Sequence, residues 1–121
     1  MDTQALEKLR EGVGRFNRGH YFEAHESLEE AWIGERGADR EFLHGLIHLA
    51  VGLYHLDSWN LDGARSQLEK GLASLAPFGD AHAGLDLTEL RAGIEACLAR
   101  IPPGIDRPDF AGLRPPRIRV L

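Results

Sequence analysis

A histidine, a glutamate and a tryptophan, His25, Glu29 and Trp32, are spaced four and then three residues apart. On a helix, residues at positions i, i+4 and i+7 lie on one face, and residues 21–33 carry the apolar spacing of a helix. Imidazole and carboxylate groups transfer protons and bind metal ions, while an indole adds an aromatic surface and one hydrogen-bond donor. This face therefore predicts either a functional site or a buried network of polar side chains.

Three more histidines occur in the most apolar segment, which the spacing predicts to be a helix over about 40–56. They are His44, His48 and His55. At 100° per residue they lie on one narrow stripe, but the helical rise separates successive members by about 6 and 10.5 Å. One metal ion could therefore bind at most an adjacent pair from this helix.

The first hypothesis for this chemistry is a binding site without catalysis. A polar pocket would bind a small molecule or a peptide of a partner protein, as small helical-repeat domains commonly do on a concave face. The residues expected to form this pocket are His25, Glu29, Trp32, Tyr54 and His55.

The alternative hypothesis is a metal-dependent hydrolase. Histidine nitrogen and carboxylate oxygen are usual ligands of zinc, and two histidines with one carboxylate suit non-haem iron. The candidate ligands for zinc or iron are His25, Glu29, His48 and His55, with Glu26 as a carboxylate that would activate water. The sequence leaves open whether the protein is an enzyme.

Other residues that could carry chemistry are expected to be structural. His20 and His82 fall in turns, where we expect them to be solvated. Trp59, in the turn after the apolar helix, is expected to anchor packing, and Cys97 to fill a small space in the core.

Composition narrows the classes of function. A chain of 121 residues with a net charge of −5 is expected to be one domain that does not bind nucleic acid, which favours a basic face. No apolar run approaches the roughly 20 residues that cross a membrane, and the first residues lack a secretory pattern. With a single cysteine, which allows no internal disulfide, these features predict a cytoplasmic protein.

Helical spacing of apolar residues recurs along the chain and predicts an all-α protein. Asp2 or Thr3, Asp39 and Asn60 are expected to cap helices. The only strand-like stretch is short, at about 118–121. The five expected helices cover about residues 6–16, 21–33, 40–56, 61–75 and 86–101.

A shift of 40 residues aligns the first part of the chain with the next, for example Gly12 with Gly52 and Leu28 with Leu68. This repeat predicts two antiparallel helical hairpins, similar to tetratricopeptide units, followed by a C-terminal helix. Gly45 and Gly52 lie seven residues apart on one helix face, which predicts that a neighbouring helix approaches very closely.

The prolines that follow the last helix predict a change of organisation. We expect residues 1–101 to form a single helical domain and residues 102–121 to form an extended, proline-rich arm that packs on it. A homo-oligomer or a larger assembly would require a large apolar patch, which we would expect on the fourth or fifth helix.

A longer pattern joins the opening face to the apolar helix that follows it: His25-x-x-x-Glu29-x-x-Trp32, then Phe42-Leu43-x-Gly45-Leu46-Ile47-x-Leu49-Ala50, then Tyr54-His55. Over roughly residues 16–75, this pattern resembles the bacterial and archaeal family called domain of unknown function 309. The resemblance implies a small all-α domain with His25, Glu29 and Trp32 as signature residues, and it implies no activity. Whether His44 and His48 are functional stays open.

Overall fold

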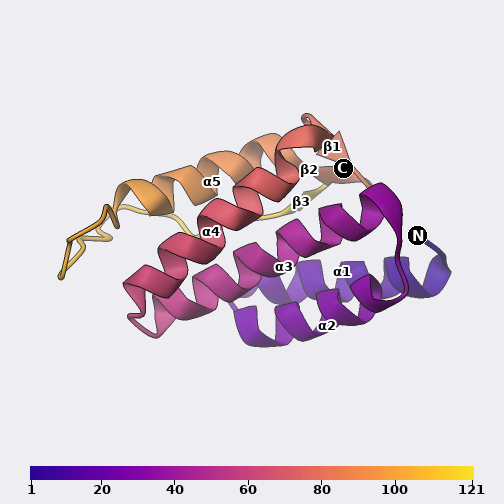
Figure 1. Ribbon diagram of the computed structural model, residues 1–121, viewed down its shortest axis with the longest axis horizontal. Helices are drawn as coiled ribbons and strands as arrows, with labels where there is room; N and C mark the ends of the chain where they lie inside the picture. Colours follow the sequence, from indigo (N-terminus) through magenta and orange to yellow (C-terminus); the bar gives the residue numbers. More distant parts are fainter.

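The computed structural model describes all 121 residues and is built mainly of five helices (Figure 1). A 3-10 turn, η1 (Ala76–Phe78), and three strands of two residues each complete the secondary structure. The all-α fold predicted from the apolar spacing is confirmed. The helices are α1 (Thr3–Asn17), α2 (Tyr21–Ile33), α3 (Gly37–Asp57), α4 (Leu61–Leu75) and α5 (Leu87–Ala99).

Side-chain caps set the starts of three helices. Asp2, Asn60 and Asp86 each accept a hydrogen bond from backbone N–H groups in the first turn of α1, α4 and α5, respectively. These N–H groups have no partner inside the helix, so each cap satisfies donors that would otherwise be unpaired. The predicted cap at Asn60 is therefore confirmed, and Asp2 is the cap among the two candidates for the first helix.

Asp39 was predicted to cap the third helix, and this prediction is wrong. α3 begins two residues earlier, at Gly37, so Asp39 lies in its first turn. Its carboxylate is instead shared between two distant groups, the Met1 ammonium at 3.3 Å and His82 Nε2 at 2.9 Å. His82, which was expected to be solvated, is only partly exposed, at 30% of its side chain, and its ring centroid lies 4.5 Å from that of Phe42.

Asp39 should make stability depend on pH in the acid range. The hydrogen bond from His82, followed by the Met1 ammonium, lowers the pKa of Asp39 below its usual value. The stabilisation is therefore complete above about pH 4, the unfolded value, and is lost as pH falls through the lower folded value. We expect Asp39→Asn to lower the free energy of unfolding by about 0.5–1 kcal/mol at neutral pH.

Urea unfolding of both proteins at several pH values measures this difference. It should shrink towards zero in strong acid, where Asp39 is protonated and resembles asparagine. A difference that stays constant from neutral to strongly acid pH would show that the Asp39 charge does not contribute.

The two hairpins repeat one helix-crossing contact, as the 40-residue shift predicts. A Cβ atom added at Gly12 would lie 2.8 Å from Leu28 Cγ, and one added at Gly52 would lie 2.8 Å from Leu68 Cγ. Gly45 also faces α4, as predicted, with Leu75 Cγ 3.0 Å from an added Cβ. Glycine at these crossings allows the paired helices to approach more closely than any other residue would.

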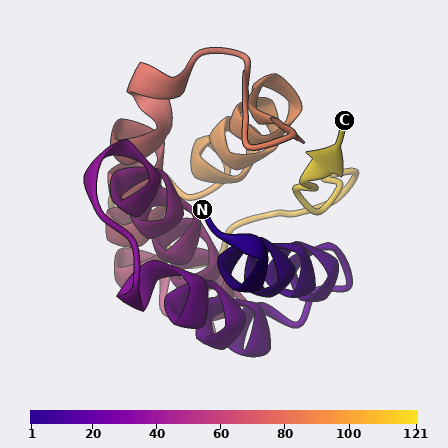
Figure 2. The same ribbon diagram turned by 90° about the vertical axis from the view of Figure 1, so that its right-hand side faces the viewer.

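Seen end-on, the helices follow a curve from α1 to α5, and the C-terminal segment lies between the two ends of the curve (Figure 2). Asn17 of α1 holds this segment with two hydrogen bonds of 2.8 Å, one to Ile118 O and one from Ile118 N. Pro116 lies close to Gly93 of α5. The segment after α5 therefore contacts both ends of the helical array, although the division at residue 101 stays a prediction.

A small antiparallel sheet in the order β1-β2-β3 joins the last segment to the start of α5. Its strands are β1 (Ala81–His82), β2 (Leu85–Asp86) and β3 (Arg119–Val120). The stretch predicted as strand-like contains β3. The β1–β2 hairpin was missed, because two-residue strands are too short to show an alternating pattern.

The hydrophobic core is centred on α3, which contributes nine buried residues, among them Phe42, Leu46 and Leu49. One face of α3 packs on α4 and the other on α2 (Figure 1). None of the helices combines the length and hydrophobicity that crossing a bilayer requires.

Candidate functional site

The face of α2 that carries His25, Glu29 and Trp32 lies beside α3. Aromatic contacts between the two helices show how they are paired. The rings of Phe22 and Tyr54 lie 5.5 Å apart at one end of the pair, and those of Trp32 and His44 lie 5.5 Å apart at the other. The two helices therefore run antiparallel, and at the Phe22–Tyr54 end their side chains line a hollow. We call this surface the α2–α3 groove.

His25 forms the hydrogen-bonded pair with Glu29 that the spacing predicts. Its Nε2 lies 3.1 Å from Glu29 Oε1, and its Nδ1 lies 3.0 Å from the backbone oxygen of Phe22. Nδ1 is therefore within hydrogen-bonding distance of a carbonyl oxygen, and Nε2 faces the Glu29 carboxylate. Glu29 is 47% exposed, so its carboxylate is the accessible member of the pair, with His25 holding it in place.

A small cavity opens next to this pair. It has a volume of about 180 Å³ and mostly apolar walls. It brings together three predicted site residues, His25, Tyr54 and His55, with three that the sequence reasoning missed. The lining residues are Tyr21, Phe22, His25, Val51, Tyr54 and His55.

Phe22 is the most informative of the missed residues. Its apolar side chain suggested a place in the core, yet it is 46% exposed, and Tyr54 is 42% exposed. The useful signal was its position three residues before His25, which places both on one helix face. Two exposed aromatic rings therefore flank the cavity.

Trp32 lies at the other end of the helix pair, outside this cavity. The Arg40 guanidinium is stacked 3.9 Å above its ring, and His44 packs on it at an interplanar angle of 28°. Its Nε1–H is buried without a hydrogen-bond partner. Burial and the nearby charge of His48 lower the pKa of His44, in that order. The five residues expected in one pocket are thus divided between two clusters.

The four candidate metal ligands do not converge on one point, although His25 lies next to Glu29. His48 Nδ1 contacts Gln67 Oε1 at 2.7 Å, and His55 Nδ1 lies 3.3 Å from the side-chain amide of Asn60. No three histidine, cysteine, aspartate or glutamate side chains lie so that they could hold one metal ion. Zinc or iron binding stays a prediction that this geometry does not support.

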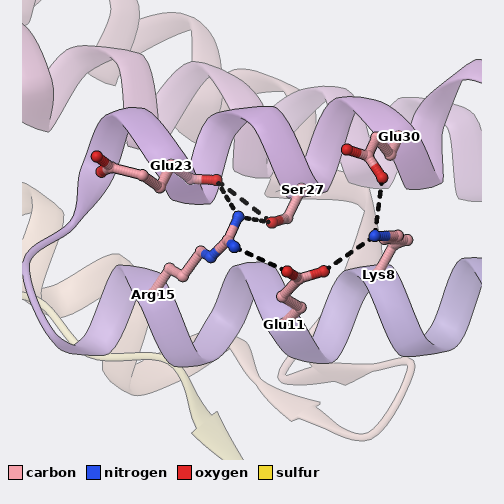
Figure 3. Close-up of polar contacts among 6 residues, drawn as sticks. All are labelled: Lys8, Glu11, Arg15, Glu23, Ser27 and Glu30. Atoms are coloured by element: carbon pink, nitrogen blue, oxygen red, sulfur yellow. Dashed lines mark hydrogen bonds and ion pairs between the residues drawn. The ribbon is translucent and has the colours of Figure 1, made fainter.

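A ladder of charged and polar side chains joins the opposite side of α2 to α1 (Figure 3). Arg15 donates to Ser27 Oγ at 2.7 Å, and Ser27 is 1% exposed. Lys8 reaches Glu30 at 2.9 Å, and its hydrogen bonds, first with Glu30, raise its pKa. By anchoring this side of α2, the ladder sets the rotation that presents His25 to α3. Its members are Lys8, Glu11, Arg15, Glu23, Ser27 and Glu30.

Two comparisons with known proteins agree with the predicted family. Residues 9–67 match the model of the family described as Domain of unknown function (DUF309). A protein of Aquifex aeolicus (strain VF5), named "Uncharacterized protein", is 30% identical over 97 residues, which cover 79% of this chain and 29% of that protein. The chain thus spans less than a third of the length of this relative.

The predicted resemblance to the DUF309 family is confirmed over residues 9–67, a little under half of the chain. The matched segment contains all of α2 and α3, and therefore the whole groove between them.

Proposed function

We propose that this domain is a binding module whose α2–α3 groove recognises a short segment of a partner protein. The segment would carry an apolar side chain next to a basic one. The observation that carries this proposal is the pair of exposed rings, Phe22 and Tyr54, flanking a cavity beside the Glu29 carboxylate.

The volume of the cavity favours a peptide over a larger small molecule. Pockets for drug-sized ligands and cofactors usually measure about 300–1,000 Å³, whereas this cavity measures about 180 Å³. A cavity of about 150 Å³ holds a benzene ring. The space therefore suits one aromatic or large aliphatic side chain, inserted from a chain that lies along the groove.

Charge favours a basic neighbour for that side chain. Glu29 Oε1 lies 3.1 Å from His25 Nε2, and the Glu29 side chain is 47% exposed next to a residue that lines the cavity. Glu23 and Glu26 are exposed on the same helix. A lysine or arginine beside the inserted side chain would pair with Glu29, and the acidic surface would speed association.

The hydrolase alternative has less support. It requires at least three ligands around one metal ion and an open coordination position. Nδ1 of His25 contacts the backbone oxygen of Phe22, its Nε2 faces Glu29, and the other candidate histidines contact Gln67 and Asn60. Binding requires only the cavity and the oriented carboxylate.

Selection of peptides from a random phage-displayed library on the immobilised domain tests this function. Enriched peptides should carry an aromatic or large aliphatic residue close to lysine or arginine. Because central aromatic residues and desolvated charges dominate binding, Tyr54→Ala and Glu29→Gln should each weaken binding by about tenfold or more. Glu7→Gln, at an exposed position of α1, makes the same charge change away from the groove and should have no effect.

Two results would overturn the proposal. One is the absence of any enriched sequence. The other is a set of peptides that bind Tyr54→Ala and wild-type protein equally, provided that circular dichroism shows the variant to be folded.

A further inference from the structure

A second cavity lies on the other side of α3, beneath the C-terminal segment. It has a volume of about 310 Å³ and is lined largely by apolar residues of α3, α5 and the segment that follows α5. Among the lining residues are three aromatic rings, Tyr21, Trp59 and Phe110, and two charged groups, Asp57 and Arg114. Tyr21 borders both cavities and so separates this one from the α2–α3 groove. We call it the inner cavity.

Trp59 occupies a turn position at which the first helical hairpin has a glycine. The 40-residue repeat aligns it with Gly19, and the two residues end α3 and α1 in the same way. In both turns, this residue donates to the carbonyl three residues back, and the next residue donates to the carbonyl five residues back. That pattern requires a left-handed backbone, and φ is +80° at Gly19 and +59° at Trp59.

The tryptophan is unfavourable for folding at this position. A bulky side chain rarely adopts a positive φ, and glycine adopts it without strain. Burial does not compensate, because Trp59 is 62% exposed. Its ring meets that of Phe110 at 5.9 Å and 54°, so that the two rings form a corner of the inner cavity. Strained residues that are kept despite an available alternative are concentrated at functional sites.

Asp57, two residues before Trp59, is a second residue whose type is unfavourable for folding at its position. It is the last residue of α3, where the exposed carbonyl groups make the helix end negative and disfavour an anion. Partial burial raises its pKa, and it forms no ion pair with a cation of the chain, including Arg114 in the same cavity. Its charge contributes to the raised pKa of Tyr21, about 12, after burial. Both side chains line the inner cavity.

We propose that the inner cavity binds a small organic cation carrying an alkylammonium group, held by Asp57 and by the rings of Trp59, Phe110 and Tyr21. Aromatic faces, a carboxylate and a helix C-terminus all create negative potential, and together they attract a cation. Both unfavourable residues become favourable once the cation is present. Arg114 would repel a positive group at its own end, which directs the charge of the ligand towards Asp57.

The test compares choline with its uncharged carbon analogue, 3,3-dimethylbutan-1-ol, which has nearly the same shape. Each is titrated into the full chain at constant ionic strength, and the indole N–H resonance of Trp59 is followed by NMR. Choline should cause a saturable shift and bind at least about tenfold more tightly than the analogue, a factor equivalent to 1.4 kcal/mol. Absence of a saturable shift, or equal binding of the analogue, would overturn the proposal.

Two variants locate the site, with calorimetry as the readout. Asp57→Asn and Trp59→Gly should each weaken choline binding about tenfold or more, while the melting temperature stays the same or rises, because each removes an unfavourable feature. Glu95→Gln, a matched charge change at an exposed position of α5, should bind choline normally. Unchanged choline binding by both site variants would refute the assignment.

This inference does not depend on the proposed peptide site. Tyr54→Ala removes a wall of the α2–α3 groove and does not touch the lining of the inner cavity. It should therefore leave choline binding unchanged, and a loss of choline binding in Tyr54→Ala would also contradict the inner site.

Discussion

Gly71→Ala is expected to destabilise the protein by about 1–3 kcal/mol, the usual effect of overfilling a packed interface. An added Cβ would lie 2.5 Å from Leu49 Cδ2 and 3.0 Å from the backbone oxygen of Gly45, where α3 and α4 cross. The leucine side chain could rotate away, but the backbone oxygen could move only with the whole helix. Alanine also forms helices better than glycine by about 1 kcal/mol, so a net loss would show that the contact dominates.

Gly14→Ala is the matched control and should have the opposite sign. This glycine also lies inside a helix, α1, but the nearest atom to an added Cβ is Arg18 Nη1 at 3.7 Å. We expect a gain of about 0.5–1 kcal/mol from the better helix former. Urea unfolding of both variants measures the two values. Equal effects of the two substitutions would mean that the close crossing of α3 and α4 does not limit stability.

Ile118→Ala should lower the free energy of unfolding by about 2–5 kcal/mol, as expected for a fully buried isoleucine. The side chain is 1% exposed, although it lies in the last four residues of the chain. Its backbone N–H donates a hydrogen bond to the side-chain amide of Asn17, and its backbone oxygen accepts one from the same amide. The segment therefore cannot rearrange easily to fill the space that the missing side chain leaves.

Val120→Ala, two residues further on, is the control, since Val120 is 55% exposed. It should change stability by no more than about 0.5 kcal/mol. Thermal unfolding of the two variants checks this contrast. If Ile118→Ala were as stable as Val120→Ala, the C-terminal segment would not contribute to the stability of the core.

The helical repeat could be predicted from sequence because the contacts that define it are local and periodic. Gly12 and Gly52 occupy equivalent positions, and the structure gives them equivalent leucine partners. The contacts of Asp39 could not be predicted in this way. Its residue type predicted a cap, but its partners, Met1 and His82, are 38 and 43 residues away, and no local pattern contains that information.

The candidate site was predicted in part for the same reason. The pairing of His25 with Glu29 follows from helical spacing alone. The division of the predicted residues into two clusters depends on how α2 lies along α3, which places Trp32 beside His44 and away from Tyr54. The inner cavity was not foreseen, and Trp59 was expected to anchor packing, because its left-handed backbone and its exposure are visible only in three dimensions.

The central claim is that the α2–α3 groove binds an apolar side chain next to a basic one. NMR shift mapping with N-acetyl-phenylalanyl-arginine amide, the smallest peptide with both groups, tests this claim most directly. We predict saturable shifts at the backbone amides of Phe22, His25, Val51 and Tyr54, and much weaker shifts when glutamate replaces the arginine of the peptide. Shifts confined to other surfaces, or no saturable shifts at millimolar peptide, would contradict the claim.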